Sequence, residues 1–248
     1  MQKMKVGNKF TAEHQALLFA WIVKAAIDAV GEEKAALVVK KAVTRYGEQR
    51  GHRMAMRAQN NVHPLTMLNY VAYGEWKTGK NEMHMEYMER SPNLRVLISK
   101  CSWYTAWENK DLTKYGRYYC LYIDQSVVRG FNPDLKLDIG DLKPDGKAAC
   151  DMVFHGLRLG MKELFVIAMR KLFKPGNKAI MPWDYHTGHI YKTMREVFIE
   201  ELGEDGSKII NDAMAEFIKF YGEELAHIVY SFQNIDFNTL PDKNLKCN

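Results

Sequence analysis

The chain has 248 residues, of which 47% are hydrophobic and 26% are charged, and its formal net charge is +5. This composition is typical of a soluble globular protein that is long enough to bury a substantial core. The basic residues are spread along the chain without a run of five, so we expect no nucleic-acid partner.

The longest apolar run, Ala16–Val23, is too short to span a bilayer, and the first fifteen residues lack the pattern of a secretory signal. We therefore expect a cytoplasmic protein without a membrane partner. In that compartment the four cysteines, Cys101, Cys120, Cys150 and Cys247, are expected to be reduced thiols rather than a disulfide framework.

The first part of the chain is predicted to be helical. Apolar periodicity predicts a helix over Thr11–Ala29, with Thr11 as its N-cap and Gly31 as its stop. A longer helix follows over Glu32–Gln59, and a short one over Pro64–Gly74.

The period of the pattern then changes from helical to alternating. Two hairpins are expected, the first from Glu82–Ser91 and Asn93–Cys101, the second from Leu135–Leu142 and Lys147–His155 around the turn KPDG. Between the hairpins, residues 103–130 read as helical with a break near Gly116.

Three more helices are predicted over Leu157–Leu172, His189–Leu202 and Asp205–Phe232. We expect one α+β domain over residues 1–248, with a helical part (1–80), a sheet with inserted helices (81–156) and a helical C-terminal part (157–248). A small antiparallel sheet of about four strands would be covered by the N-terminal, central and C-terminal helices.

Cys120 and Asp124 are four residues apart in a predicted helix, so their side chains share one helical face. A thiol attacks as its thiolate, and a neighbouring carboxylate raises the pKa of a thiol instead of lowering it. Asp124 therefore suits proton transfer or substrate anchoring better than activation of Cys120, and a cation must come from elsewhere in the fold. The alternative is a buried, unreactive thiol beside a solvated acid.

Arg50, Arg53 and Arg57 also share one helical face, in the sequence RYGEQRGHRMAMRAQ. Small and apolar residues surround them, which predicts that this helix is largely buried. A buried arginine needs an anion, supplied either by Asp or Glu or by a substrate. The alternative is a solvated basic face.

Glu48 and His52, and likewise Glu223 and His227, have the i, i+4 spacing of side chains that could join a metal site in a helical bundle. Neither HExxH nor CxxC occurs, so a structural role is favoured for these histidines. The chain also lacks a P-loop, a GxGxxG after a strand and a GxSxG, which removes support for nucleotide, dinucleotide and α/β-hydrolase chemistry.

Five motifs follow one another along the chain, namely YGEQRGHRMAMRA (Tyr46–Ala58), CSWYTAW (Cys101–Trp107), YYCLYID (Tyr118–Asp124), FNPDLKL (Phe131–Leu137) and GKAACDMVF (Gly146–Phe154). This ordered set resembles the L-2-amino-thiazoline-4-carboxylic acid hydrolase family. The matched positions are Cys101, Trp107, Cys120, Asp124, Asn132 and Cys150.

The resemblance implies a hydrolase that opens the ring of a small cyclic amidine or amide-type substrate bearing a carboxylate, by hydrolysis of a C–N bond. We expect Cys120 as the nucleophile, Cys101 as the second choice, and Asp124 as the group that transfers the proton. The substrate-binding residues are expected to be Arg53, Arg57, Trp107, Tyr118 and Asn132.

Three alternatives stay open at this stage. No cofactor is predicted, but zinc held by Cys101, Cys120, Asp124 and His155 could activate water instead. The domain could also be a non-catalytic small-molecule sensor, or a structural protein whose apolar C-terminal helices form a homodimer.

Overall fold

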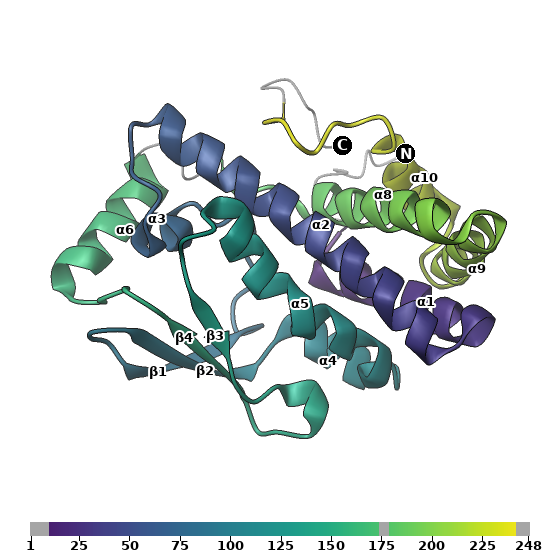
Figure 1. The fold of residues 1–248 in the computed structure, drawn as a ribbon, viewed down its shortest axis with the longest axis horizontal. Helices are drawn as coiled ribbons and strands as arrows, with labels where there is room; N and C mark the ends of the chain where they lie inside the picture. The colour runs from purple at the N-terminus through teal and green to yellow at the C-terminus, as the bar shows by residue number, and fades with distance from the viewer. Residues whose placement is uncertain (1–9, 174–178, 242–248) are drawn as a thin grey trace, which may run out of the picture.

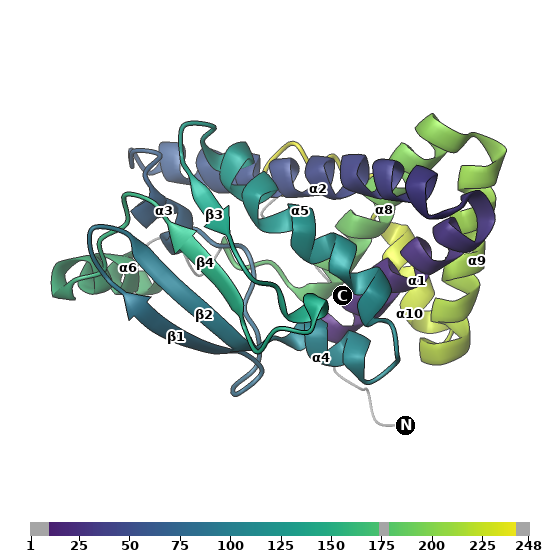
Figure 2. The same ribbon diagram turned by 60° about the horizontal axis from the view of Figure 1, so that its bottom comes forward.

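The structure is a computed structural model that describes residues 10–173 and 179–241. A four-stranded sheet lies at one end of the molecule and the helices α9 (Glu204–Tyr221) and α10 (Glu223–Ser231) lie at the other, as Figures 1 and 2 show. This arrangement confirms the predicted α+β class. No described helix is long and apolar enough to cross a membrane.

The N-terminal helices begin and end where the sequence signals predict. In α1 (Ala12–Val30), the backbone N–H of Thr11 donates to His14 Nδ1 over 3.1 Å, which closes the first turn. Gly31 adopts φ +82° and its N–H donates to the carbonyl of Ile27, so the chain leaves α1 and enters α2 (Glu32–Asn60) directly.

The sheet has the order β1-β2-β4-β3, and all neighbouring strands are antiparallel. Its strands are β1 (His84–Glu89), β2 (Leu94–Lys100), β3 (Leu137–Ile139) and β4 (Cys150–Phe154). Both predicted hairpins are confirmed, and β2 pairs with β4 to join them.

The central helices are α3 (Met67–Ala72), α4 (Ser102–Glu108), α5 (Thr113–Phe131) and α6 (Met161–Phe173). The break in the predicted central helix comes at residues 109–112, before Gly116, and Asp111 has φ +55° there. Gly116 instead lies inside α5. A side chain has no room at this position, because an ideal Cβ would lie only 2.0 Å from the ring of Trp107.

The predicted helix over Asp205–Phe232 is wrong in one respect, because it is two helices. Gly222 adopts φ +87° and ends α9, and α10 starts at the next residue. The preceding helix, α8 (Trp183–Leu202), begins six residues before the predicted start at His189.

Two apolar clusters hold the helices and the sheet together. The larger one fills the space between the helices α1, α2, α4, α5, α8, α9 and α10. The smaller one lies between one face of the sheet and α3, α5 and α6, and its buried members are Met67, Leu94, Val96, Val128, Leu137, Leu142, Cys150, Met152, Leu157 and Leu159. α5 belongs to both clusters, so it connects the sheet to the helical body.

The backbones of α2 and α5 approach each other closely through glycines. A Cβ on Gly51 would lie 2.1 Å from the carbonyl oxygen of Val127, and a Cβ on Gly130 would lie 2.2 Å from that of Glu48. These contacts fix α5 against the helix that carries Arg50, and so they set the distance between Arg50 and Asp124.

Substituting Gly51 with alanine is expected to lower the free energy of unfolding by about 2–3 kcal/mol, because the added methyl group meets backbone that cannot move aside cheaply. Urea unfolding of the variant measures this. Gly74→Ala is the matched control, because its Cβ would meet nothing closer than 3.8 Å. Equal stability of the two variants would show that α2 and α5 leave room for a methyl group at Gly51.

Candidate functional site

One face of α5 carries Cys120 and Asp124 toward the core side of the sheet. Cys101 lies at the start of α4 directly after β2, and Cys150 is the first residue of β4. The three thiols and Asp124 lie within electrostatic reach of one another. Negative charge on Cys101, on Cys150 or on Asp124 would raise the pKa of the Cys120 thiol. The structure thus brings together the predicted thiol and acid residues, with Cys150 added.

The thiols of this cluster are neutral at pH 7. Burial raises the pKa of Cys101 to about 11, and only the nearby backbone N–H groups of Trp103 and Tyr104 oppose it. Burial also raises the pKa of Cys120 well above its usual value. Neither cysteine therefore holds a resident thiolate, and its proton must leave during the attack.

Asp124 is the group of this cluster that titrates near neutral pH. It is half-buried, and its carboxyl group makes no hydrogen bond to another residue of the described ranges. Burial raises the pKa of its carboxyl group to about 6, although the charge of Arg50 acts in the opposite direction. A carboxyl group with this pKa can both accept and return a proton at physiological pH.

Arg50 on α2 is a cation within electrostatic reach of Asp124. Its side chain is 3% exposed, its Nε has no hydrogen-bond partner among the described residues, and the nearest oxygen of Glu75 is 3.8 Å away. Tyr70 lies within electrostatic reach of both Arg50 and Asp124. Arg50 therefore keeps the capacity to bind a further anion at this site.

Arg53 and Arg57, which were predicted to hold the substrate carboxylate, are instead bound to the buried Glu75. Arg53 donates to both carboxylate oxygens, over 3.0 and 2.8 Å, and Arg57 Nη1 donates to Oε1 over 2.5 Å. Burial alone would raise the pKa of Glu75, but the charges of these arginines hold it at about 2. The sequence left two possible counterions for these arginines, a protein carboxylate or a substrate. In the structure the counterion of both is the carboxylate of Glu75.

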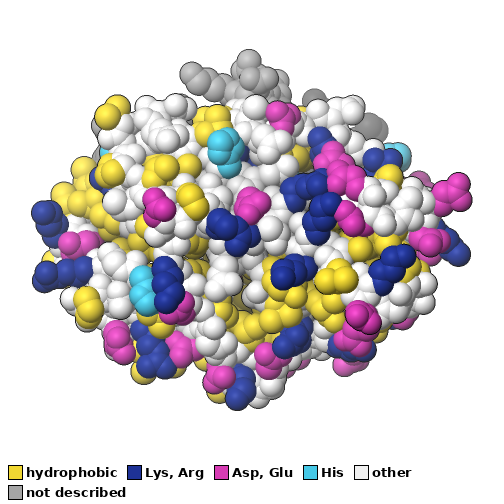
Figure 3. Space-filling view, in the orientation of Figure 1, with side chains coloured by type: hydrophobic (Ala, Val, Ile, Leu, Met, Phe, Trp, Pro, Cys, Tyr) yellow, Lys and Arg dark blue, Asp and Glu magenta, His cyan; other side chains and the backbone are white. Residues whose placement is uncertain are grey.

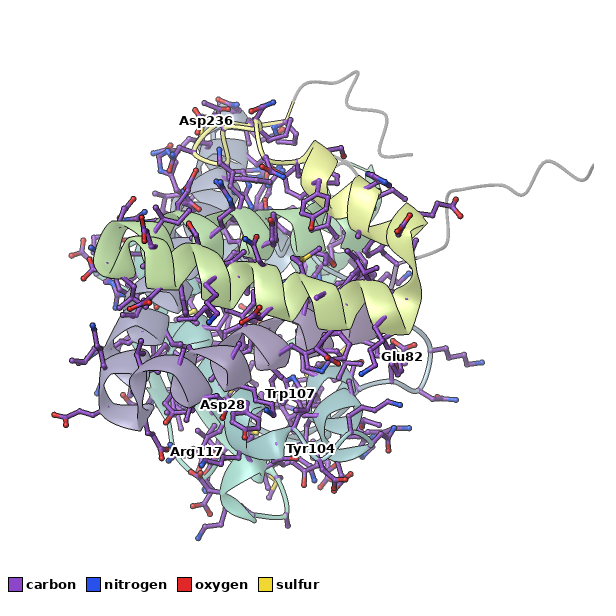
Figure 4. All side chains as sticks on the ribbon, turned by 90° about the vertical axis from the view of Figure 1, so that its right-hand side faces the viewer. Asp28, Glu82, Tyr104, Trp107, Arg117 and Asp236 are labelled. Carbon is purple, nitrogen blue, oxygen red and sulfur yellow. The ribbon has the colours of Figure 1, made fainter. Side chains whose placement is uncertain are left out.

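The three other predicted substrate-binding residues also have partners within the protein. Trp107 Nε1 donates to the carbonyl of Ala16 over 2.8 Å, in the interior beside the N-terminal helices, as Figure 4 shows. The Tyr118 hydroxyl donates to Glu32 Oε1 over 2.9 Å, and Asn132 Nδ2 donates to the carbonyl of Leu65 over 2.8 Å. These contacts fasten α4 and α5 to the helical body, so we assign the three side chains a structural role.

The side chains named for the zinc alternative do not form one cluster. His155 Nε2 lies 2.7 Å from Asp138 Oδ2, at the end of β4, and not beside Cys120. Within residues 10–173 and 179–241, no three His, Cys, Asp or Glu side chains group in a way that could hold a metal ion. The described side chains therefore do not fit the predicted zinc set.

Two buried histidines extend the arginine cluster. His189 Nε2 lies 2.8 Å from Gln49 Oε1, and Arg53 Nη2 lies 3.4 Å from Nδ1 of the same ring. Because arginine only donates, Nδ1 is the acceptor and Nε2 carries the proton. Burial lowers the pKa of His186 to about 3 and that of His189 well below its usual value, so both rings are neutral.

No sequence pattern indicated Glu75, and the pattern HTGHIY was only an ambiguous signal for His186 and His189.

A pocket of about 580 Å³ opens on the surface between α2, α5 and α8, away from Cys120 and Asp124. Its charged side chains already pair with one another or with neighbours, as Arg129 does with Glu48 over 2.6 Å. We place the candidate site at the thiol–acid cluster and not at this pocket, because the cluster combines thiols with a carboxyl group whose pKa is raised.

Comparison with known proteins adds one finding. The family model for L-2-amino-thiazoline-4-carboxylic acid hydrolase matches residues 10–154, more than half of the chain, and includes Arg50, Cys101, Cys120, Asp124 and Cys150. No curated protein and no solved structure gives a significant match.

Proposed function

Because the chain belongs to the L-2-amino-thiazoline-4-carboxylic acid hydrolase family, we propose that it is a hydrolase that opens the ring of a small cyclic amidine or amide-type substrate bearing a carboxylate. The observation that carries this proposal is the raised pKa of Asp124, about 6, on the same helical face as Cys120. A proton-transferring carboxyl group beside a thiol is what ring opening at an amidine carbon requires.

Arg50 would bind the substrate carboxylate, because its Nε is buried without a partner among the described residues. The ring carbon of the amidine would then lie against Cys120. Arginine is suited to this task because it stays charged and recognises planar carboxylates. Tyr70, which interacts with both Arg50 and Asp124, would border the bound ring.

The reaction begins as the sulfur of Cys120 adds to the amidine carbon while the thiol proton passes to Asp124. The electron pair of the C=N bond moves onto the ring nitrogen, which takes the thiol proton from Asp124. The C–N ring bond then breaks as the exocyclic amino group of the substrate forms a new C=N bond, and the proton that this group loses passes through Asp124 to the leaving nitrogen. Water next attacks the carbon bound to sulfur, gives a proton to Asp124, and releases Cys120, which takes that proton back. The neutral thiol of the resting protein is consistent with this order, because proton transfer accompanies the attack instead of preceding it.

The proposal is tested by incubating the protein with 2-aminothiazoline-4-carboxylate and following the ring-opened product by mass spectrometry. We expect Cys120→Ala to lose at least about a thousandfold in kcat/KM, and the intact protein to gain the mass of the opened substrate during turnover. Cys150→Ala, at the buried first residue of β4 in the same cluster, is the matched control and should keep most activity.

A covalent adduct that persists in Cys120→Ala but vanishes in Cys101→Ala would move the nucleophile to Cys101. Full activity in both variants would leave no role for a cysteine and would contradict the proposed mechanism.

A further inference from the structure

Exposed apolar side chains gather on two elements at one end of the molecule. Of the ten large hydrophobic side chains that the described residues expose, seven lie on β1 and α6, namely Met85, Tyr87, Met88, Met161, Leu164, Phe165 and Met169. Figure 3 shows a hydrophobic patch at the left of the molecule, where Figure 1 places α6. Patches of this kind mark surfaces that bind other proteins.

β1 is the outermost strand of the sheet, and all six of its residues are exposed. Its outer edge has no strand partner among the residues that the structure describes. A free edge with unpaired backbone groups readily pairs with another strand, and proteins usually protect such an edge with lysine, proline or a covering element. β1, with the sequence HMEYME, has neither lysine nor proline.

We propose that β1 is a homodimer interface, at which the β1 strands of two copies of this chain pair antiparallel across a two-fold axis. Two identical strands related by a two-fold axis can pair only in the antiparallel direction. The two four-stranded sheets would then form one sheet of eight strands.

The polar side chains of β1 favour a two-fold axis at Met85 over one at Glu86. Met85 and Tyr87 pair with Ile98 and Val96, whose side chains pack on the core face of the sheet, and His84 and Glu86 lie on the other face with 3.4 Å between His84 Nε2 and Glu86 Oε1. A two-fold axis at Met85 places His84 opposite the partner's Glu86, and Glu86 opposite the partner's His84. An axis at Glu86 would place two carboxylates opposite each other, which is destabilising.

The exposed stripe of α6 supplies further apolar area for the same interface. Met161, Leu164, Phe165 and Met169 follow the i, i+3, i+4, i+8 spacing of one helical face, and Phe165 is 65% exposed. α6 and the end of β1 lie at the same end of the molecule in Figures 1 and 2. A stable dimer buries about 1,200 Å² or more in total, so a second element beside the short strand is needed.

The mass of the full-length protein in solution tests the proposal, by light scattering after size exclusion over a range of concentrations. We expect twice the chain mass of 28.7 kDa for the unmodified protein. Met85→Lys and Phe165→Lys should each weaken the dimer at least about tenfold while circular dichroism and ring-opening activity stay unchanged. Leu37→Lys is the matched control, because Leu37 is 67% exposed on α2, away from β1, and should leave the dimer intact.

Cross-linking then tests the register. In oxidised protein, Met85→Cys should form a disulfide between subunits, because residues facing each other across the axis have Cα atoms about 4.5–5.5 Å apart. Glu86→Cys should not, and the unmodified protein shows any background from the native cysteines. A mass of 28.7 kDa at every concentration would overturn the dimer, including the case in which another protein pairs with β1. Cross-linking through Glu86→Cys but not Met85→Cys would overturn the register.

Discussion

Replacing Glu75 with alanine is expected to lower the free energy of unfolding by about 3–5 kcal/mol, because the change leaves buried arginines without their counterion. Glu75 is fully buried, Arg53 is fully buried, and Arg57 is only 7% exposed. Both arginines donate directly to this one carboxylate, and Arg50 lies 3.8 Å from it. An uncompensated guanidinium group in the interior loses its hydration without gaining a partner.

Urea unfolding followed by circular dichroism measures this effect. Glu200→Ala is the matched control, because Glu200 also binds an arginine through both oxygens, but at the surface, where such a pair is worth about 0–1 kcal/mol. If the two variants lost the same free energy, the buried arginine cluster would not have the structural role assigned to it.

The pH dependence of stability follows from the same cluster. The pKa of Glu75 falls from its ordinary value of 4.5 to about 2 in the folded protein, so its stabilising contribution is fully present above pH 4.5 and is lost as the pH falls through about 2. In Glu75→Ala this acid-dependent loss of stability should be smaller, since the group that takes up the proton is gone.

The helix boundaries show what a glycine in the sequence can and cannot predict. Gly31 was predicted to end α1 and does so, while Gly116 was predicted to break a helix and instead lies within α5. Gly222, which was not predicted as a break, ends α9 with a positive φ. Gly31 and Gly222 adopt the positive φ that favours glycine and ends a helix. Gly116 instead makes room for the ring of Trp107, and that contact depends on tertiary packing.

Some features of the candidate site follow from spacing along one helix, and others depend on contacts that only the tertiary fold creates. Cys120 and Asp124 share a face because of their spacing along one helix, so the sequence was sufficient to pair them. The three arginines on one helical face were also visible in the sequence, but not which of them lacks a hydrogen bond to Glu75. Glu75 follows α3 and reaches Arg53 and Arg57 only through the fold, which leaves Arg50 as the arginine beside Asp124.

Replacing Asp124 with asparagine is expected to lower kcat/KM by about 10²–10⁴-fold, because asparagine cannot accept the proton of the attacking thiol. In the unmodified protein, kcat/KM should rise with pH through about 6, as the carboxyl group ionises. The variant should lack this rise. In Arg50→Gln the rise should move to higher pH, because the charge of Arg50 holds the pKa of Asp124 down, whereas Arg50→Lys should keep it closer to the original position.

Stability separates this loss of activity from a loss of fold. Since burial raises the pKa of Asp124 from 3.8 to about 6, ionisation of this group opposes folding, and the penalty is absent below pH 3.8 and complete above about pH 6. At pH 8, the free energy of unfolding of Asp124→Asn, measured with urea, should therefore exceed that of the unmodified protein by up to roughly 3 kcal/mol. Near pH 4 the two proteins should be about equally stable. A less stable variant at pH 8 would mean that the ionised carboxylate has a stabilising partner, and Asp124 would then be a structural residue and not the proton-transferring group of the site.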